Sequence, residues 1–165
     1  MLFRSGSYNR EILDKSLIKR VRLIKRADGF YCQFVLDLER VEPFEPTGKE
    51  VGIDVGLNDF LTDSNGRKVE NPRFLRKAEK RLKKAQRKLS KKKKGSNKHQ
   101  KQKCKVARLH LKVSRQRKDF VVKTAKALIQ SNDLVVYEDL KVSNMVKNRK
   151  LAKSISDASW SMFTN

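Results

Sequence analysis

The chain has 165 residues, with 41 Lys and Arg against 18 Asp and Glu, a formal net charge of +23. Such an excess favours a polyanionic partner, and nucleic acid comes first. An anionic membrane is the weaker candidate, because no apolar run can span a bilayer and neither a lipidation nor a secretory signal is present. Between Arg67 and Lys118 there are 24 Lys and Arg but only two acids, so this segment holds 22 of the 23 net charges.

The first predicted element is a β-hairpin. Residues 18–26 alternate apolar and basic side chains, Asp28-Gly29 is a strong turn signal, and residues 30–39 alternate again. Two prolines and a glycine within residues 42–50 then indicate a linker. Cys32 in this hairpin forms no C-x-x-C pair, so the sequence predicts free thiols and no zinc site.

An antiparallel meander is predicted over residues 51–70. Its first strand, VGIDV, sets Asp54 among β-branched residues, and Gly52 and Gly56 on either side would allow another group to approach closely. An ionised carboxylate inside a buried strand is costly unless it has a partner. Asp54 therefore requires a specific explanation.

Two long helices are predicted over about residues 72–131. Each carries apolar residues at spacings of three and four, and a polar loop with Gly95 and four lysines separates them, which predicts an antiparallel helical hairpin. Arg117 lies where the second apolar seam calls for an apolar side chain. The first seam comprises Leu75, Ala78, Leu82, Ala85 and Leu89, and the second comprises Val106, Leu109, Val113, Phe120, Val121, Ala125 and Leu128.

The last elements are a short strand and a helix. Residues 134–137, LVVY, are fully apolar, which is typical of a strand covered on both faces, and they run into Glu138. A weakly amphipathic helix is predicted over residues 151–163, with Trp160 packing it onto the sheet.

Two acids could carry chemistry. Asp54 and Glu138, on neighbouring strands of one sheet, could converge on Mg²⁺, which prefers carboxylate oxygens and in pairs promotes phosphodiester hydrolysis. The alternative is that Asp54 caps a turn at Gly56 and Glu138 caps a helix. Residue chemistry alone leaves the two interpretations balanced, and Asp139 could replace Glu138 in either role.

The basic segment predicts a surface for the phosphate backbone. A solvated helical face normally mixes both charges, whereas acids are almost absent here. Neutralising several phosphates would give salt-dependent, sequence-independent binding, and the scarcity of aromatic residues favours backbone contacts over base reading. The predicted contact residues are Arg76, Lys80, Arg81, Lys83, Lys84, Arg87, Lys88, Lys91, Lys92, Lys93, Lys94, Arg115, Arg117 and Lys118.

Five strings occur in order across nearly the whole chain: GIDVGLNDFLTDSNG, RKAEKRLKKAQRKLSKKKKGSNK, QRKDF, LVVYEDLKVSNMVKN and KLAKSISDASW. Together they resemble the transposon-encoded OrfB/TnpB proteins, RNA-guided DNA endonucleases of bacterial insertion sequences. The resemblance implies an α/β fold: a partial RNase H-like (RuvC-like) sheet with a long basic antiparallel helical hairpin, preceded by a β-hairpin remnant of a β-barrel.

The resemblance also implies roles for the parts of the chain. Residues 1–48 would be the last strands of a wedge-type barrel domain, and residues 49–165 an incomplete RuvC-like domain. Asp54 would be the first catalytic acid and Glu138 the second, both as Mg²⁺ ligands. The implied partners are DNA and guide RNA, with no membrane, in the bacterial cytoplasm at the nucleoid.

Compared with the family pattern, the sequence resembles a protein truncated at both ends, and two features expected at the C-terminal side bear on activity. Family members add a zinc ribbon, which would hold Zn²⁺, and a third catalytic aspartate, and neither is found here; Asp157 is not that acid. The resemblance thus implies a fragment or split gene, inactive or very weak as a nuclease alone, with an uncovered sheet face that favours self-association.

Two alternatives remain open. A non-enzymatic RNA- or DNA-binding protein would explain the basic hairpin equally well, but not the two acids at strand positions. A regulator that competes with longer relatives for guide RNA is the other. If Asp54 and Glu138 lie apart, the binding-only alternative is favoured.

Overall fold

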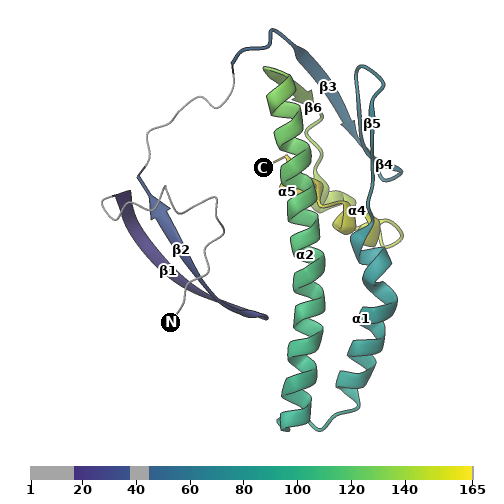
Figure 1. Cartoon of the computed structure of the whole chain (residues 1–165). Coiled ribbons are helices and arrows are strands. Elements are labelled where there is room, and N and C mark those ends of the chain that lie inside the picture. Colours follow the sequence, from purple (N-terminus) through teal and green to yellow (C-terminus); the bar gives the residue numbers. More distant parts are fainter. Residues whose placement is uncertain (1–16, 38–44, 165) are drawn as a thin grey trace. The chain divides into compact units, whose positions relative to one another are not determined.

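The computed structural model describes residues 17–37 and 45–164, and its contacts divide the chain into two units, Met1–Pro43 and Phe44–Asn165 (Figure 1). The domain boundary predicted between residues 48 and 49 stays a prediction, and residues 1–16 and 38–44 of the predicted barrel remnant lie outside the described part. Within the described residues, no helix is long and apolar enough to cross a membrane.

The first unit contains the predicted β-hairpin. Strand β1 (Ile18–Arg26) pairs antiparallel with β2 (Gly29–Leu36), with Leu23 opposite Cys32. Beyond β2, the exposed carboxylate of Asp37 forms an ion pair with Lys19 of β1 at 2.8 Å. The hairpin was predicted to extend to residue 39, whereas β2 ends at Leu36 and residues 38–39 lie outside the described part.

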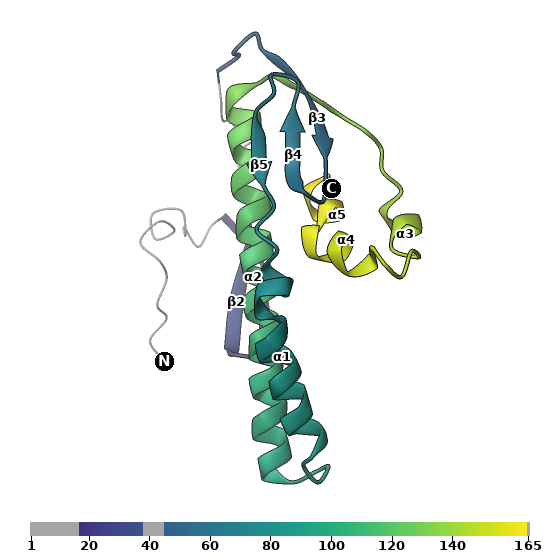
Figure 2. The ribbon, with the colours of Figure 1, turned by 90° about the vertical axis from the view of Figure 1, so that its right-hand side faces the viewer.

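The second unit is built on a four-stranded sheet of order β5-β4-β3-β6, and Figure 2 shows β5, β4 and β3 of this sheet. Strands β3 (Glu50–Val55), β4 (Asp59–Asp63) and β5 (Lys68–Glu70) form the predicted antiparallel meander. Strand β6 (Leu134–Tyr137) adds to the other side of β3 and runs parallel to it. A parallel pair requires a crossover connection, and here the helices supply it.

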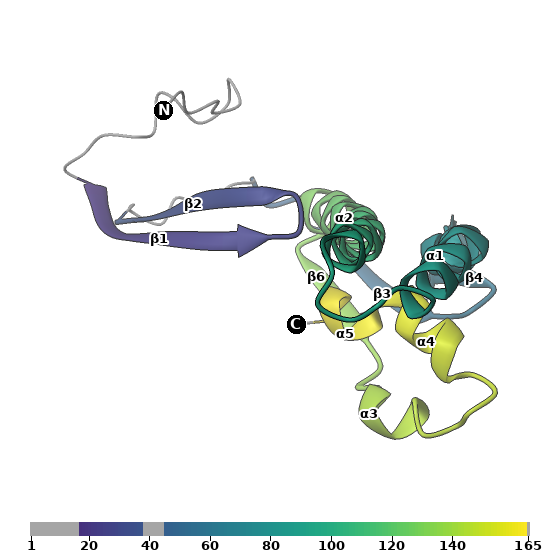
Figure 3. The same ribbon diagram turned by 90° about the horizontal axis from the view of Figure 1, so that it is seen from below.

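Helices α1 (Phe74–Ser90) and α2 (Asn97–Ser131) lie side by side and are joined by a short loop (Figures 1 and 3). Helix α1 begins two residues later than Pro72, because Arg73 has left-handed backbone angles. Helix α2 begins within the segment predicted as a loop, because the Ser96 hydroxyl accepts a hydrogen bond from the His99 amide and caps it. The apolar seams meet as expected, with Leu82, Ala85 and Val113 buried.

The predicted terminal helix is interrupted. Helix α4 (Ala152–Ala158) is followed by Ser159, whose left-handed φ of 61° changes the direction of the chain before α5 (Trp160–Phe163). A further short helix, α3 (Val142–Met145), follows β6 and was not predicted. Trp160 is buried as expected.

One core joins the sheet to the helices. Phe60 of β4 is fully buried and meets Phe120 of α2 edge-on at 4.9 Å between ring centroids. Helix α4 adds Ile155, which is 1 % exposed. The buried members of this core are Val51, Ile53, Phe60, Leu61, Val121, Ile155, Ala158 and Trp160.

The prediction that β6 is covered on both faces is wrong. Leu134 and Val136 are 48 % and 57 % exposed, because α2 and α5 pack on the face that carries Ile53 and Val135. Strand β6 is also at the sheet edge. An apolar run reports composition alone, whereas exposure depends on which elements cover the strand.

Candidate functional site

The two predicted acids occupy neighbouring positions at one end of the sheet. In the parallel pair of β3 and β6, the register ends with Ile53 opposite Tyr137. Both carboxylate residues are exposed. Because side chains alternate along a strand, Asp54 points to the face opposite buried Ile53. Each acid directly follows a member of the last residue pair that joins the two strands.

Neither acid serves as the cap that was considered as an alternative. Among the described residues, no hydrogen bond or ion pair engages the carboxylate of Asp54 or Glu138. The turn after β3 is closed by the Gly56 amide, which donates to the Phe60 carbonyl at 3.2 Å. Helix α3 begins after Lys141, so Glu138 does not cap it. Both carboxylates are therefore free to accept an external ligand.

The two glycines beside Asp54 differ in how closely their neighbours pack. A Cβ at Gly56 would lie 3.0 Å from the Asp59 carbonyl oxygen, tighter than an ordinary contact, so glycine suits this turn. A Cβ at Gly52 would meet only Ser64, at an ordinary 3.8 Å. The close approach of another group at these glycines stays a prediction.

The acidic side chains at this end of the sheet offer some of the oxygen ligands that a hard cation needs. Asp54 and Glu138 offer carboxylate oxygens, and exposed Asp139 follows directly. Mg²⁺ is bound through one or two carboxylates and keeps several waters, so two such groups fit it. No cluster of three or more His, Cys, Asp or Glu side chains with metal-binding geometry occurs among residues 17–37 and 45–164.

The basic surface lies on α1, the following loop and α2. On α1 a groove of about 470 Å³ is lined entirely by lysines and arginines. Of the fourteen predicted contact residues, all are exposed except Lys92 and Arg117, which are half-buried. The residues that line the groove are Lys80, Lys83, Lys84, Arg87, Lys88 and Lys91.

Arg117 differs from the other predicted contact residues. Its guanidinium donates to a carboxylate oxygen of Asp157 from Nε at 3.1 Å and from Nη2 at 2.8 Å. The side chains of Arg117 and Asp157 are only 20 % and 7 % exposed. Arg117 is therefore committed to a buried ion pair, which corrects its assignment to the phosphate-binding surface and explains why a cation interrupts the apolar seam.

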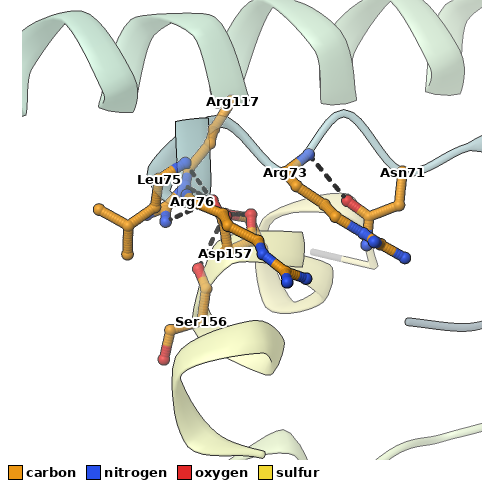
Figure 4. Close-up of polar contacts among 8 residues, drawn as sticks. Asn71, Arg73, Leu75, Arg76, Arg117, Ser156 and Asp157 are labelled. Carbon is orange, nitrogen blue, oxygen red and sulfur yellow. Dashed lines mark hydrogen bonds and ion pairs between the residues drawn. The ribbon is translucent and has the colours of Figure 1, made fainter. Parts of the chain in front are cut away.

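Asp157 also caps α1 (Figure 4). Its two carboxylate oxygens accept hydrogen bonds from the amides of Leu75 at 2.8 Å and Arg76 at 3.1 Å. Sequence reasoning excluded Asp157 as a catalytic acid but assigned it no role. The available signal was the unmatched Arg117 in the seam, because a buried cation needs an acid partner.

A second set of contacts anchors the start of α1 to the loop after β3. The Asn71 side-chain amide donates to the Leu57 carbonyl at 3.1 Å, and the Arg73 guanidinium donates to the same oxygen at 3.4 Å. The Arg73 amide in turn donates to the Asn71 side chain at 3.2 Å. Leu57 lies three residues beyond Asp54, so these contacts connect the basic hairpin to the acid-bearing strand.

Asp133 fixes the start of β3 to the start of β6. Its carboxylate accepts hydrogen bonds from the Thr47 and Gly48 amides at 2.8 and 2.7 Å, and from the Thr47 hydroxyl at 3.0 Å. The backbone hydrogen bonds of Thr47 and then Gly48 hold the pKa of Asp133 below its usual value, against the opposing effect of burial. This clamp supports the parallel register of the two strands.

Fold and site together define a mixed α/β protein with two adjacent acids at a sheet end and a basic pair of helices. A family model described as "Probable transposase" (OrfB_IS605) matches residues 33–149. The chain belongs to this OrfB family, as its resemblance to the OrfB/TnpB proteins predicted.

Two curated relatives support the assignment. A "Putative RNA-guided DNA endonuclease" of Streptomyces pristinaespiralis is 44 % identical over 135 residues, covering 82 % of this chain and 33 % of the relative. A "Putative RNA-guided DNA endonuclease InsQ" of Escherichia coli K12 is 36 % identical over 132 residues, covering 80 % of this chain and 33 % of the relative. The chain thus spans about a third of the length of these relatives.

Proposed function

We propose that this chain is the part of a transposon-associated, RNA-guided DNA endonuclease that binds nucleic acid on the helical hairpin and contributes Asp54 and Glu138 to a Mg²⁺ site. The observation that carries the proposal is the parallel pairing of β3 and β6, in which the last matched residues, Ile53 and Tyr137, are each followed directly by an acid. The names of the two relatives support the reaction class.

The sheet topology supports a RuvC-like, RNase H-like assignment. Three antiparallel strands in sequence order are followed through long helices by a fourth, β6, which lies at the sheet edge and runs parallel to its neighbour β3. Acids at such adjacent strand ends are well placed to share a cation. We assign the family's first acid to Asp54 and its second to Glu138.

The roles proposed for the residues follow from their chemistry. Bound Mg²⁺ would activate water and stabilise the leaving oxygen of a phosphodiester. Asp54 and Glu138 would hold the cation by their carboxylate oxygens. The lysines and arginines of α1 and the loop would neutralise backbone phosphates of DNA, guide RNA or their hybrid, independent of base sequence.

Metal binding tests the proposal most directly. Mn²⁺, a paramagnetic substitute for Mg²⁺, is expected to broaden the amide resonances around Asp54 and Glu138 selectively, and excess Mg²⁺ should reverse the effect. Asp54→Asn or Glu138→Gln should weaken this binding roughly tenfold or more, because each removes a charged oxygen ligand.

Cleavage of supercoiled DNA by the chain with Mg²⁺ is expected to be weak, since two carboxylates supply few of the ligands that two cations need. The weak cleavage is expected to disappear in Asp54→Ala.

Asp119→Asn is the matched control, because Asp119 is an exposed acid on α2 paired with Lys123 and distant in sequence from both acids. It should leave the Mn²⁺ effect unchanged. Broadening that persists in Asp54→Asn would remove the metal site from the proposal. A chain that binds nucleic acid without a metal site at these acids would instead support the non-enzymatic binding alternative.

A further inference from the structure

Helix α4 lies between the sheet and the basic hairpin and contacts both. Ile155 and Ala158 belong to the core that contains the sheet residues Val51 and Ile53. On the hairpin side, α4 contacts α1, and Asp157 reaches the first turn of α1 and the middle of α2. One short helix thus joins the sheet that carries the acids to the helices that carry the charge.

The contact at Asp157 satisfies a specific need of α1. The first amides of a helix lack partners within the helix, and a side chain just before it normally supplies them. Here Arg73 occupies the cap position with left-handed angles and makes no side-chain cap. Asp157, 82 positions from Leu75 in sequence, takes that role, and its negative charge is favourable at the positive end of the helix dipole.

Arg117 completes the arrangement. The carboxylate of Asp157 would be costly to bury alone, and the Arg117 guanidinium offsets that cost with two hydrogen bonds from α2. The same carboxylate therefore fixes α1 and α2 to each other and to α4. Asn71 and Arg73 fix the same junction to the Leu57 carbonyl, in the loop that follows Asp54.

We propose that Asp157 is a positioning residue, which sets the direction of the basic hairpin relative to the sheet end that carries Asp54 and Glu138. This inference rests on the proposed function for its significance, because the hairpin and the acids must then act on one nucleic acid. Asp157 itself touches neither metal nor phosphate. Its action passes through the first turn of α1 and through Arg117.

The distance between α1 and the sheet is the direct test. Spin labels are placed at Gln86→Cys on α1 and Lys68→Cys on β5, in a chain in which Cys32 and Cys104 are changed to serine. Pulsed dipolar spectroscopy should give one narrow distance distribution for the parent. Asp157→Asn keeps a hydrogen-bond acceptor but loses the charge, so it should broaden the distance distribution. Asp157→Leu loses both and should broaden the distribution further.

Glu79→Gln is the matched control. Glu79 forms exposed ion pairs, with Lys153 of α4 at 2.5 Å and with Lys83, so its loss removes a link between the same two helices without touching the buried cap. We expect the distribution to remain narrow. Because Trp160 is the single tryptophan of the chain and is buried in the core, its fluorescence reports whether each variant retains its packing.

Three outcomes decide the inference. A graded broadening from parent to Asn to Leu, with native Trp160 fluorescence at least in Asp157→Asn, supports it. Equal widths for parent and Asp157→Asn and Asp157→Leu, with native fluorescence, overturn it, as does equal broadening by Glu79→Gln. The measurement needs neither nucleic acid nor metal, so a failure of the proposed function, seen in the Mn²⁺ experiment, is distinguishable from a failure of this inference.

Discussion

At the scale of single residues, burial decides what a cation does in this protein. Lys83 and Arg117 were predicted to contact phosphate alike. The Lys83 side chain is 63 % exposed and its ion pair with Glu79 is open to solvent, so it can exchange that partner for a phosphate. The Arg117 side chain is 20 % exposed and held by a buried carboxylate, so releasing it would leave an unpaired buried charge.

This difference predicts opposite results for two neutralising substitutions. Lys84→Gln should reduce the slope of log affinity against log salt by about 0.9 for duplex DNA, because one phosphate contact is lost. Its free energy of unfolding should change little. Arg117→Gln should leave the slope unchanged but lower the free energy of unfolding by about 3 kcal/mol, because Asp157 loses its buried partner.

Fluorescence anisotropy at several salt concentrations and urea unfolding measure the two effects separately. A lower salt slope in Arg117→Gln, with unchanged stability, would return Arg117 to the phosphate-binding surface.

At the scale of elements, an ion pair between Glu79 of α1 and Lys153 of α4 makes the contact between these helices sensitive to pH. Hydrogen bonds from the Lys153 ammonium and then from Lys83 lower the pKa of Glu79 from 4.5 to about 2. A carboxyl whose pKa is lower in the folded state than in the unfolded state stabilises the fold at pH values above its unfolded-state pKa. That contribution is lost as the pH falls from about 4.5 to about 2.

Glu79→Gln should therefore be less stable than the parent at neutral pH and equally stable near pH 2. The urea midpoint of parent and variant, measured across this range, gives the comparison. Lys153→Gln removes the main partner of Glu79 instead. Most of the pH dependence of stability that Glu79 gives the parent should therefore be absent from this variant. A stability gap between parent and Glu79→Gln that persists unchanged to low pH would contradict the assignment.

At the scale of the whole molecule, the separation of charge is the dominant feature. The segment from Arg67 to Lys118 holds 22 of the 23 net positive charges, and most of its cations lie exposed on two adjacent helices and their loop. Their mutual repulsion disfavours the folded hairpin unless anions are near. A polyanion that binds the folded state should relieve this repulsion and stabilise the fold by mass action.

Heparin at roughly 100-fold its dissociation constant should raise Tm by roughly 5–10 °C, as expected from binding linkage for a chain of this size. Differential scanning fluorimetry measures the shift, and neutral dextran is the control polymer. Replacing Lys91, Lys93 and Lys94 with glutamine should reduce the effect, because these exposed loop lysines contribute to the surface. A shift of equal size in that variant would place the binding elsewhere.

The sequence by itself determined the elements and the charge of this protein. Period-two alternation predicted the β-hairpin, a β-branched run and a turn signal predicted the meander, and apolar seams predicted the paired helices, because these patterns depend on neighbours close in the chain. The family followed from ordered strings such as GIDVG around Asp54. Helix ends were less predictable, because the left-handed Arg73 and the Ser96 cap set them locally.

Only the tertiary structure decided which residues meet across long distances. The register that sets Ile53, next to Asp54, opposite Tyr137, next to Glu138, depends on a parallel pairing between strands separated by the whole hairpin. The burial of Arg117, the cap that Asp157 provides and the open face of β6 depend on which elements pack together. Such contacts leave no local periodicity, because the interacting groups are brought together by the fold alone.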